Sequence, residues 1–297
     1  MRVRFWGVTG TIPSPSLVAS TGGGGRACGN TTCIEVSWPG QTIIYDAGSG
    51  FLAFGESIFA ELAADSLRST RIDLILSHPH LDHLMGLVFG ALTYDPRLRI
   101  HLWASPATLE ALNILLNPAS PTSRIYFPPT FIEMKGLADR NAVIPGSTFE
   151  LGEAKVQTMA LRHPGGCMGF RLTIGTKSIV LASDHEHPRQ GVDEDLARFC
   201  EGADVVYTEG QYTRDEYEGL TALGAGPPIP RKGWGHSTME DCLATAMAAR
   251  CGHLVLGHHD PIRPLESLGH HHARLLAVAG NRLRLSMAIE GEILNLA

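Results

Sequence analysis

The sequence predicts an α/β protein in which layered β-sheets are covered by helices. Strand-like and helix-like segments occur in two successive blocks of the chain, which is typical of stacked sheets with helices outside. The chain has 297 residues and is 44% hydrophobic, enough apolar side chain for a sizeable core. Because no repeat and no linker interrupts the pattern, we expect residues 1–297 to form a single domain.

The first block contains four expected strands and two expected helices. A continuous apolar run at 71–77 is typical of a buried strand, and the strand that begins at 41 ends in an Asp/Gly turn. Ser105 is an N-cap residue type and is followed by Pro106, which predicts a helix start. The expected strands are 3–8, 32–38, 41–45 and 71–77, and the expected helices are 54–65 and 105–117.

Two segments of this block predict loops. Residues 21–32 are Gly-rich but have neither the Lys-Ser/Thr ending of a Walker motif nor a GxGxxG fingerprint, so they favour a turning loop over a phosphate cradle. Residues 117–131 are rich in Pro and aromatic side chains, and we expect them to form a covering loop.

The second block repeats the alternation of strands and helices after residue 149. Its apolar runs predict strands that each end in polar residues, and the segment from 211 to 235 predicts a loop. The expected strands lie within 154–163, 168–175, 177–187, 204–210 and 253–260, with two short strands at the end of the chain; the expected helices are 193–201, 237–251 and 265–278.

The overall charge excludes some functions. Lys plus Arg is 24 and Asp plus Glu is 30, a net charge of -6, which argues against a broad basic surface for long nucleic acid.

No apolar run approaches the about 20 residues of a membrane helix, and the first residues show no leader pattern. The six cysteines are scattered without CxxC pairs. We therefore expect a cytoplasmic protein with reduced thiols and no membrane partner.

The segment "ILSHPHLDHLMG", residues 75–86, carries the densest chemistry in the chain. Imidazole and carboxylate groups are suitable ligands for zinc, manganese or iron. Neighbouring residues of a helix diverge by about 100°, so we expect a loop leaving the strand to bring these side chains together. Four ligand-type side chains occur within six positions: His78, His80, Asp82 and His83.

The HxHxDH pattern at the end of an apolar strand resembles the defining motif of the metallo-β-lactamase superfamily. Four further motifs follow in the family's order, each after an expected strand: "YDAGSG" at 45–50, "LRHPGG" at 161–166, "LASDHEH" at 181–187 and "LVLGHHDP" at 254–261. The resemblance covers nearly the whole chain. It implies a four-layer αββα sandwich whose active site lies along one edge of the sheets.

The resemblance also implies two divalent metal ions that share a bridging hydroxide. Zinc and manganese are the expected metals, and iron is the third option. One ion would be held by His78, His80 and His163, the second by Asp82, His83 and His258, and Asp184 would bridge both. Asp82 is also expected to orient the hydroxide. Two such ions activate water and neutralise charge on both oxygens of a displacement.

Two positions leave alternatives open. His258 and His259 are adjacent, so an extended chain points them to opposite faces, and we choose His258 because it directly follows the apolar strand. Asp46 is either a turn residue or a carboxylate that supports the metal ligands.

The segment "KGWGHSTMEDCLATAMAARC" at 232–251 resembles the phosphodiesterase branch of the superfamily, which includes RNase Z and phosphoribosyl cyclic phosphate phosphodiesterase. "GNTTCIEV" and "HPGGCMGFRL" fit the latter group more closely. The resemblance implies that His236 lies near the substrate phosphate and assists departure of the leaving oxygen, although a simple neighbour of a helix cap is the alternative. We therefore expect a small or cyclic phosphodiester as substrate, with the assembly open between a monomer and a homodimer.

Other functions and residue roles are weighed against this prediction. A hydrolase of lactones, thioesters or β-lactams is one alternative, but it would have less need of His236. A tRNA-type endoribonuclease is disfavoured by the net charge and by the presence of only two basic residues in 219–235. A noncatalytic metal sensor is disfavoured because the ligand set is intact. We expect Cys167 to be a neighbour of the metals, and the histidines of 269–276 to lie on the surface. Glu186 and His187 either line the pocket or form a polar turn at the strand end. Tyr212 and Trp234 either wall the pocket or only pack.

Overall fold

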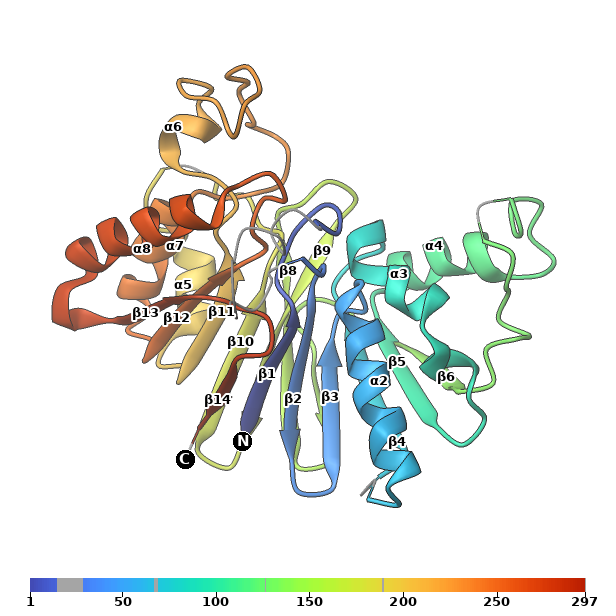
Figure 1. The fold of residues 1–297 in the computed structure, drawn as a ribbon. Coiled ribbons are helices and arrows are strands. Elements are labelled where there is room, and N and C mark those ends of the chain that lie inside the picture. The colour runs from blue at the N-terminus through green and yellow to red at the C-terminus, as the bar shows by residue number, and fades with distance from the viewer. Residues whose placement is uncertain (15–28, 67–68, 126, 189, 297) are drawn as a thin grey trace.

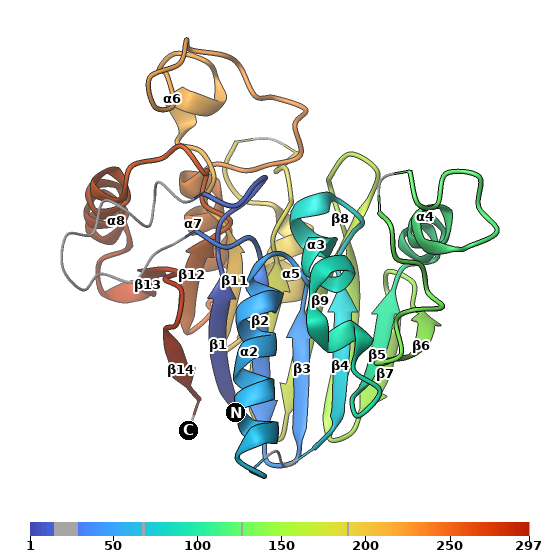
Figure 2. The same cartoon turned by 45° about the vertical axis from the view of Figure 1, so that its right-hand side comes forward.

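Two seven-stranded β-sheets packed face to face organise the described chain (Figures 1 and 2). The computed structural model describes residues 1–14, 29–66, 69–125, 127–188 and 190–296, so most of the Gly-rich loop expected at 21–32 lies outside the described residues. The strand order is β14-β1-β2-β3-β4-β5-β6 in one sheet and β13-β12-β11-β10-β9-β8-β7 in the other.

The strands of the first sheet are β1 (Arg2–Gly7), β2 (Cys33–Trp38), β3 (Gln41–Tyr45), β4 (Arg71–Leu76), β5 (Arg99–Ala104), β6 (Leu137–Ala142) and β14 (Ile293–Asn295). Those of the second sheet are β7 (Thr148–Leu151), β8 (Ala154–Leu161), β9 (Cys167–Ile174), β10 (Lys177–Ala182), β11 (Val205–Glu209), β12 (His253–Gly257) and β13 (Arg284–Met287).

Helices cover the outer face of each sheet, so the layers run helix, sheet, sheet, helix (Figure 1). On the first sheet these are α2 (Gly50–Ala63), α3 (Leu81–Phe89), the short η1 (Ala91–Tyr94) and α4 (Pro106–Leu116). On the second they are α5 (Glu194–Cys200), α7 (Met239–Ala248), α8 (Leu265–Ala279) and the short η2 (Gly280–Arg282), whereas α6 (Arg214–Tyr217) lies in a projecting loop. This arrangement confirms the predicted αββα sandwich.

The hydrophobic core lies in three layers that match this order. Between the sheets, Phe5 stacks on Tyr207 and Phe170 packs edge-on against Tyr45, with ring centroids 5.8 and 6.2 Å apart. Separate apolar clusters fill the spaces beneath α2–α4 and beneath α5, α7 and α8. Because the sandwich buries both faces of each sheet, central strands such as β11 and β12 are nearly continuous apolar runs.

The sheet topology places the predicted site at one edge. Strands β3 to β6 run parallel in the first sheet and β10 to β13 run parallel in the second. Ligand-type residues that follow β4, β10 and β12 therefore meet at the carboxyl ends of these strands, where sites form in open α/β sheets.

Several elements differ from the sequence-based expectation. Strand β6 has the mostly exposed sequence LADRNA, which carries no apolar pattern, and β7 is only four residues long. Strand β5 alternates buried and partly exposed residues but was not predicted either. The two expected short strands near the chain end do not pair with each other, because β13 joins the second sheet and β14 pairs with β1 in the first.

Helix α3 corrects the expected loop at the HxHxDH segment. Residues 77–79 form the connection after β4, His80 is the N-cap with extended backbone, and Asp82 and His83 lie in the first helical turn. Across the described residues, no helix combines the length and apolarity that a bilayer span requires.

Replacing Phe170 by Ala should lower the free energy of unfolding by about 3–5 kcal/mol, because it opens a cavity between the sheets. Phe89 is a matched control, since its side chain is 55% exposed and its loss should cost much less. Guanidinium unfolding followed by circular dichroism measures both variants. Equal losses would contradict the assignment of Phe170 to the inter-sheet core.

Candidate metal centre

Strand ends from both halves of the chain supply the candidate metal centre. His78 follows β4, His163 follows β8, Asp184 follows β10 and His258 follows β12. Asp184 and His258 have positive φ angles of 60° and 48°, which are uncommon for residues other than glycine. Such backbone conformations cluster at functional sites, where the surrounding structure must hold them.

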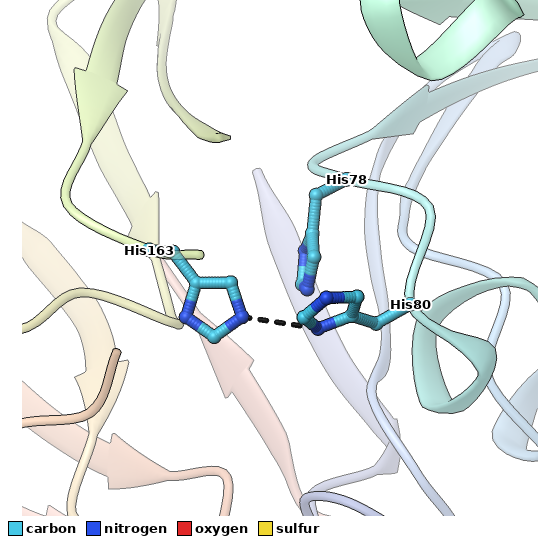
Figure 3. A group of neighbouring side chains, drawn as sticks. All are labelled: His78, His80 and His163. Atoms are coloured by element: carbon cyan, nitrogen blue, oxygen red, sulfur yellow. Dashed lines mark hydrogen bonds between the residues drawn. The ribbon is translucent and has the colours of Figure 1, made fainter. Parts of the chain in front are cut away.

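The first group of ligand-type atoms contains three imidazoles (Figure 3). His163 Nε2 lies 3.0 Å from His80 Nδ1, and His78 packs within 4.7 Å of both rings by their centroids. His78 is fully buried, His163 is partly buried and His80 is exposed. This group therefore lies where solvent and a substrate reach the centre.

The second group is completely buried. The Nε2 atoms of His83 and His258 lie 3.2 and 3.3 Å from Asp82 Oδ2. Ligands about 2.1 Å from one tetrahedral cation are separated by about 3.4 Å, so these spacings fit a shared ion.

Asp184 lies between the two groups, and each of its carboxylate oxygens faces a different group. Its Oδ2 is 3.7 Å from His78 Nε2 and 3.8 Å from His163 Nε2. Its Oδ1 is 3.4 Å from His83 Nε2 and 3.3 Å from His258 Nε2. A single carboxylate with this placement can bridge two cations.

Buried polar atoms without a hydrogen-bond partner support a fit for metal ions. Among the described side chains, these include His78 Nε2, His83 Nε2 and Asp184 Oδ1, all aimed into the cluster. Leaving such atoms unpaired is costly in a folded protein. The donor set of imidazole nitrogens and carboxylate oxygens suits Zn²⁺ and also Mn²⁺ or Fe²⁺.

Supporting hydrogen bonds aim the imidazoles at the cluster. Asp46 Oδ2 accepts from His83 Nδ1 at 2.8 Å, and its two oxygens also accept from the amide and hydroxyl of Ser77. Asp46 is thus both a turn residue, with a φ of 58°, and a partner of a candidate ligand. Ser77 Oγ contacts His78 Nδ1 at 3.0 Å. Each Nδ1 contact leaves the Nε2 atom free to bind a cation.

The electrostatics differ between the two groups. Burial lowers the pKa of His78 well below its usual value, and burial also lowers the pKa of His80 and His163. Neutral imidazole is the form that binds metal. Burial also opposes a charge on His83, but the surrounding carboxylates, Asp184 foremost, outweigh it and raise the His83 pKa well above its usual value.

The carboxylates remain ionised despite being buried. Burial opposes ionisation of Asp82, but the charge on His83 holds the pKa of Asp82 well below its usual value. Burial acts on Asp184 in the same direction, and His258 and His83 outweigh it, so its pKa is also well below normal. Both groups are therefore negative at neutral pH and attract cations.

His236 lies beside the centre and faces both groups. Its ring centroid is 5.1 Å from those of His163 and His258, and Tyr212 contacts its ring edge-on at 6.1 Å. Glu209 Oε2 lies 2.8 Å from His236 Nδ1. Burial opposes protonation of His236, but Glu209 outweighs it and raises the pKa of His236 to about 9.

Glu209 was missed by the sequence-based prediction. It is fully buried at the last position of β11, so it occupies a strand end like His78, Asp184 and His258. A polar residue that ends the apolar run "DVVYT" was the available signal.

Glu186 supports the other side of the centre. Its Oε1 accepts from Gly233 N at 2.7 Å, its Oε2 accepts from Gly235 N at 2.8 Å, and Tyr217 also donates to it. The carbonyl of Gly235 in turn lies 2.9 Å from His163 Nδ1. Glu186 therefore orients a candidate ligand through the 233–235 loop.

The remaining predicted residues lie outside the cluster. His259 is buried but turned away, with its Nε2 3.1 Å from the carbonyl of Ala288. His187 contacts Ser237 and Thr245, and Cys167 is buried with its Sγ 3.7 Å from the carbonyl of Ser183. Trp234 is 51% exposed. In the 269–276 segment, His271 contacts Arg263 and Ser267, and His272 contacts the carbonyl of Leu285.

Comparison with known proteins decides the family. The family model described as "Beta-lactamase superfamily domain" matches residues 41–259, more than half of the chain. The chain belongs to this superfamily. It is a hydrolase of the metallo-β-lactamase fold that carries the buried His/Asp cluster typical of a dinuclear centre.

Several known proteins are similar to this chain over most of their length. Ribonuclease Z of Thermoplasma acidophilum is 20% identical over 298 aligned residues, covering 88% of this chain and 87% of that protein. Zinc-bound PqqB of Methylobacterium extorquens is 19% identical, with a TM-score of 0.69 and full coverage of both chains. A diphosphatase from the PhnP family is 16% identical, with a TM-score of 0.63 and coverage of 100% of this chain and 98% of that one.

Replacing Asp46 by Asn should weaken metal affinity by about 10–100-fold, because the His83 imidazole loses its carboxylate partner. Asp73→Asn is the matched control: Asp73 is also fully buried, but it pairs with Arg71 and Trp103 away from the centre. Competition with a chromophoric chelator measures affinity. A similar loss in both variants would show that Asp46 acts only through stability.

Metal binding should release protons at neutral pH. His83 has a raised pKa without metal, so it carries a proton that a cation must displace, and affinity should rise with pH. Isothermal titration calorimetry in buffers with different ionisation enthalpies measures the released protons. A binding enthalpy independent of the buffer would contradict the protonated state of His83.

Proposed function

We propose that this protein is a metal-dependent phosphodiesterase that acts on a small or cyclic phosphodiester. The observation that carries the proposal is the combination of the Asp184 carboxylate between two ligand groups with the His236 ring, held by Glu209, beside both. The similarity to a ribonuclease and to a diphosphatase supports phosphorus chemistry, since both act on phosphate esters or anhydrides.

The chain would hold two divalent cations through the ligand sets predicted from the sequence. His78, His80 and His163 would bind one, and Asp82, His83 and His258 the other, with Asp184 shared. When bound, the cations would neutralise phosphate charge and lower the pKa of the attacking water.

His236 is the proposed general acid. At neutral pH its ring is protonated because its pKa is about 9, and Glu209 holds the Nδ1–H. The Nε2–H is then free to protonate the leaving oxygen of a phosphodiester. The fixed carboxylate behind the ring keeps the imidazole in one orientation, so the proton lies ready when charge develops on that oxygen.

Asp82 is proposed to act both as a ligand and as an acceptor that orients the attacking water. Its Oδ2 already accepts from the amide of Thr11 at 2.7 Å, which fixes the carboxylate plane. Positioning of this kind converts a bimolecular reaction into an effectively unimolecular one.

The space beside the centre suits a compact substrate. A recess of about 400 Å³ opens next to His163 and is lined also by Arg162, Glu186 and Gly235. The side chains of Leu81, next to His80, and of Trp234, two residues before His236, are exposed and would contact the organic parts of a diester. A larger groove of about 500 Å³ lies at the opposite end of the first sheet, beside Trp38 and Ser57, and includes none of the clustered ligands.

An RNA substrate is the second candidate, favoured by the similarity to ribonuclease Z. Arg231, one of two basic residues in the 219–235 segment, is buried and donates to the carbonyls of Glu216 and Ile229. It is therefore committed to holding the loop. With a net charge of -6, a short diester needs fewer phosphate contacts than a folded RNA.

Hydrolysis of bis(p-nitrophenyl) phosphate and of cyclic nucleotides by the metal-loaded protein tests the proposal. His236→Ala should lower kcat by about 100-fold or more, because it removes the proton donor. His270→Ala is the matched control, since His270 lies exposed on α8 away from the centre. Its activity should equal that of the unaltered protein.

Three results would redirect the assignment. Turnover of a lactone, thioester or β-lactam that survives His236→Ala would favour carbonyl hydrolysis. Cleavage of a tRNA precursor far above that of small diesters would favour an endoribonuclease. Saturable binding of a nucleotide without turnover by the metal-loaded protein would favour a sensor.

A further inference from the structure

The turn that follows β1 approaches two of the candidate ligands. This N-terminal turn, residues 9–12, lies against the second ligand group: the amide of Thr11 donates to Asp82 Oδ2 at 2.7 Å. A Cβ atom on Gly10 would lie 2.4 Å from both Cε1 and Nδ1 of His258. Only glycine therefore fits beside the ring in its present position.

Hydrogen bonds fix this turn to the strand end that carries His258. The Gly10 amide donates to the carbonyl of His259 at 2.9 Å, and the His259 amide donates to the carbonyl of Val8 at 2.9 Å. Thr11 has a φ of 68°, and its hydroxyl accepts from Gln211 Nε2 at 3.3 Å. Thr11 thus has an uncommon backbone conformation while its amide and its hydroxyl are both hydrogen-bonded, which indicates that the surroundings impose this conformation.

The first ligand group has a separate backing turn. There, Gly235 lies against His163: a Cβ atom would lie 2.2 Å from His163 Nδ1, and the Gly235 carbonyl contacts the same nitrogen at 2.9 Å. Each group thus has one histidine packed against a glycine, and the two glycines come from the first and second halves of the chain.

We infer that the N-terminal turn is a positioning element that sets the occupancy of the metal position formed by Asp82, His83 and His258, and so decides whether the centre holds one ion or two. This inference rests on the proposed metal centre. The turn fixes the position of Asp82 through the Thr11 amide and the position of the His258 ring through contact with Gly10. The His78, His80 and His163 position is backed by Gly235 and keeps its ion independently.

Gly10→Ala tests the inference. Gly10 does not have a positive φ, so alanine is compatible with its backbone and the substitution acts through the contact with His258. The added methyl group must displace the ring, which moves Nε2 away from Asp82 and Asp184. We expect the metal content, measured by inductively coupled plasma mass spectrometry after equilibration with Zn²⁺ and desalting, to fall from two ions per chain to one.

Two further variants separate positioning from general destabilisation. His258→Ala should also retain one ion, and Gly10→Ala added to His258→Ala should change neither the metal content nor the melting temperature further, because the ring that the methyl group meets is absent. If Gly10→Ala alone does not fold, the double variant should fold and retain one ion. Gly269→Ala on α8, where a Cβ atom meets open space, is the matched control and should retain two ions.

The outcomes distinguish this inference from the proposed function. Two ions in Gly10→Ala, an equal loss of both ions, or a double variant that fails to fold would overturn the role of the turn and leave the phosphodiesterase proposal intact. An unaltered protein that binds no metal would overturn both. Because the readout is metal content, neither result depends on finding the substrate.

Discussion

The buried carboxylate of Asp184 imposes the main constraint on this structure. It lies between four imidazole rings, with one oxygen toward His78 and His163 and the other toward His83 and His258. A buried anion is unfavourable unless positive charge compensates it. The fold must therefore bring strand ends from both sheets to within a few ångströms of this one residue. The αββα arrangement meets that requirement because the parallel strands of both sheets end at the same edge.

The sequence predicted which ligand-type residues lie together in more detail than it predicted the strands around them. Ligand-type residues after the apolar strands β4, β8, β10 and β12 gave the signal, and the structure brings the seven predicted ligands together. Their roles as ligands remain predictions. The fold class followed from the same resemblance, whereas β6 was not predicted, because its six residues are mostly exposed and have no apolar alternation.

What the sequence could not supply depends on contacts between distant segments. Asp82 and His83 lie in a helical turn, and their side chains converge with His78 only because His80 ends the extended connection as an N-cap. Glu209 is a single residue in a strand, and its importance appears only when His236 lies beside it. Gly10 and Gly235 likewise stand out only through the rings that they approach, more than 70 residues away in the sequence for each pair.

Strand β14 pairs with β1, which joins residues 293–295 to the beginning of the chain. The two marked chain ends accordingly lie near each other in Figure 1. During synthesis, the first sheet cannot gain this edge until the second half of the molecule has emerged from the ribosome. The ligand group of Asp82, His83 and His258 likewise stays incomplete until His258 is made, so this part of the ligand-binding edge assembles after translation of both halves rather than stepwise with the growing polypeptide.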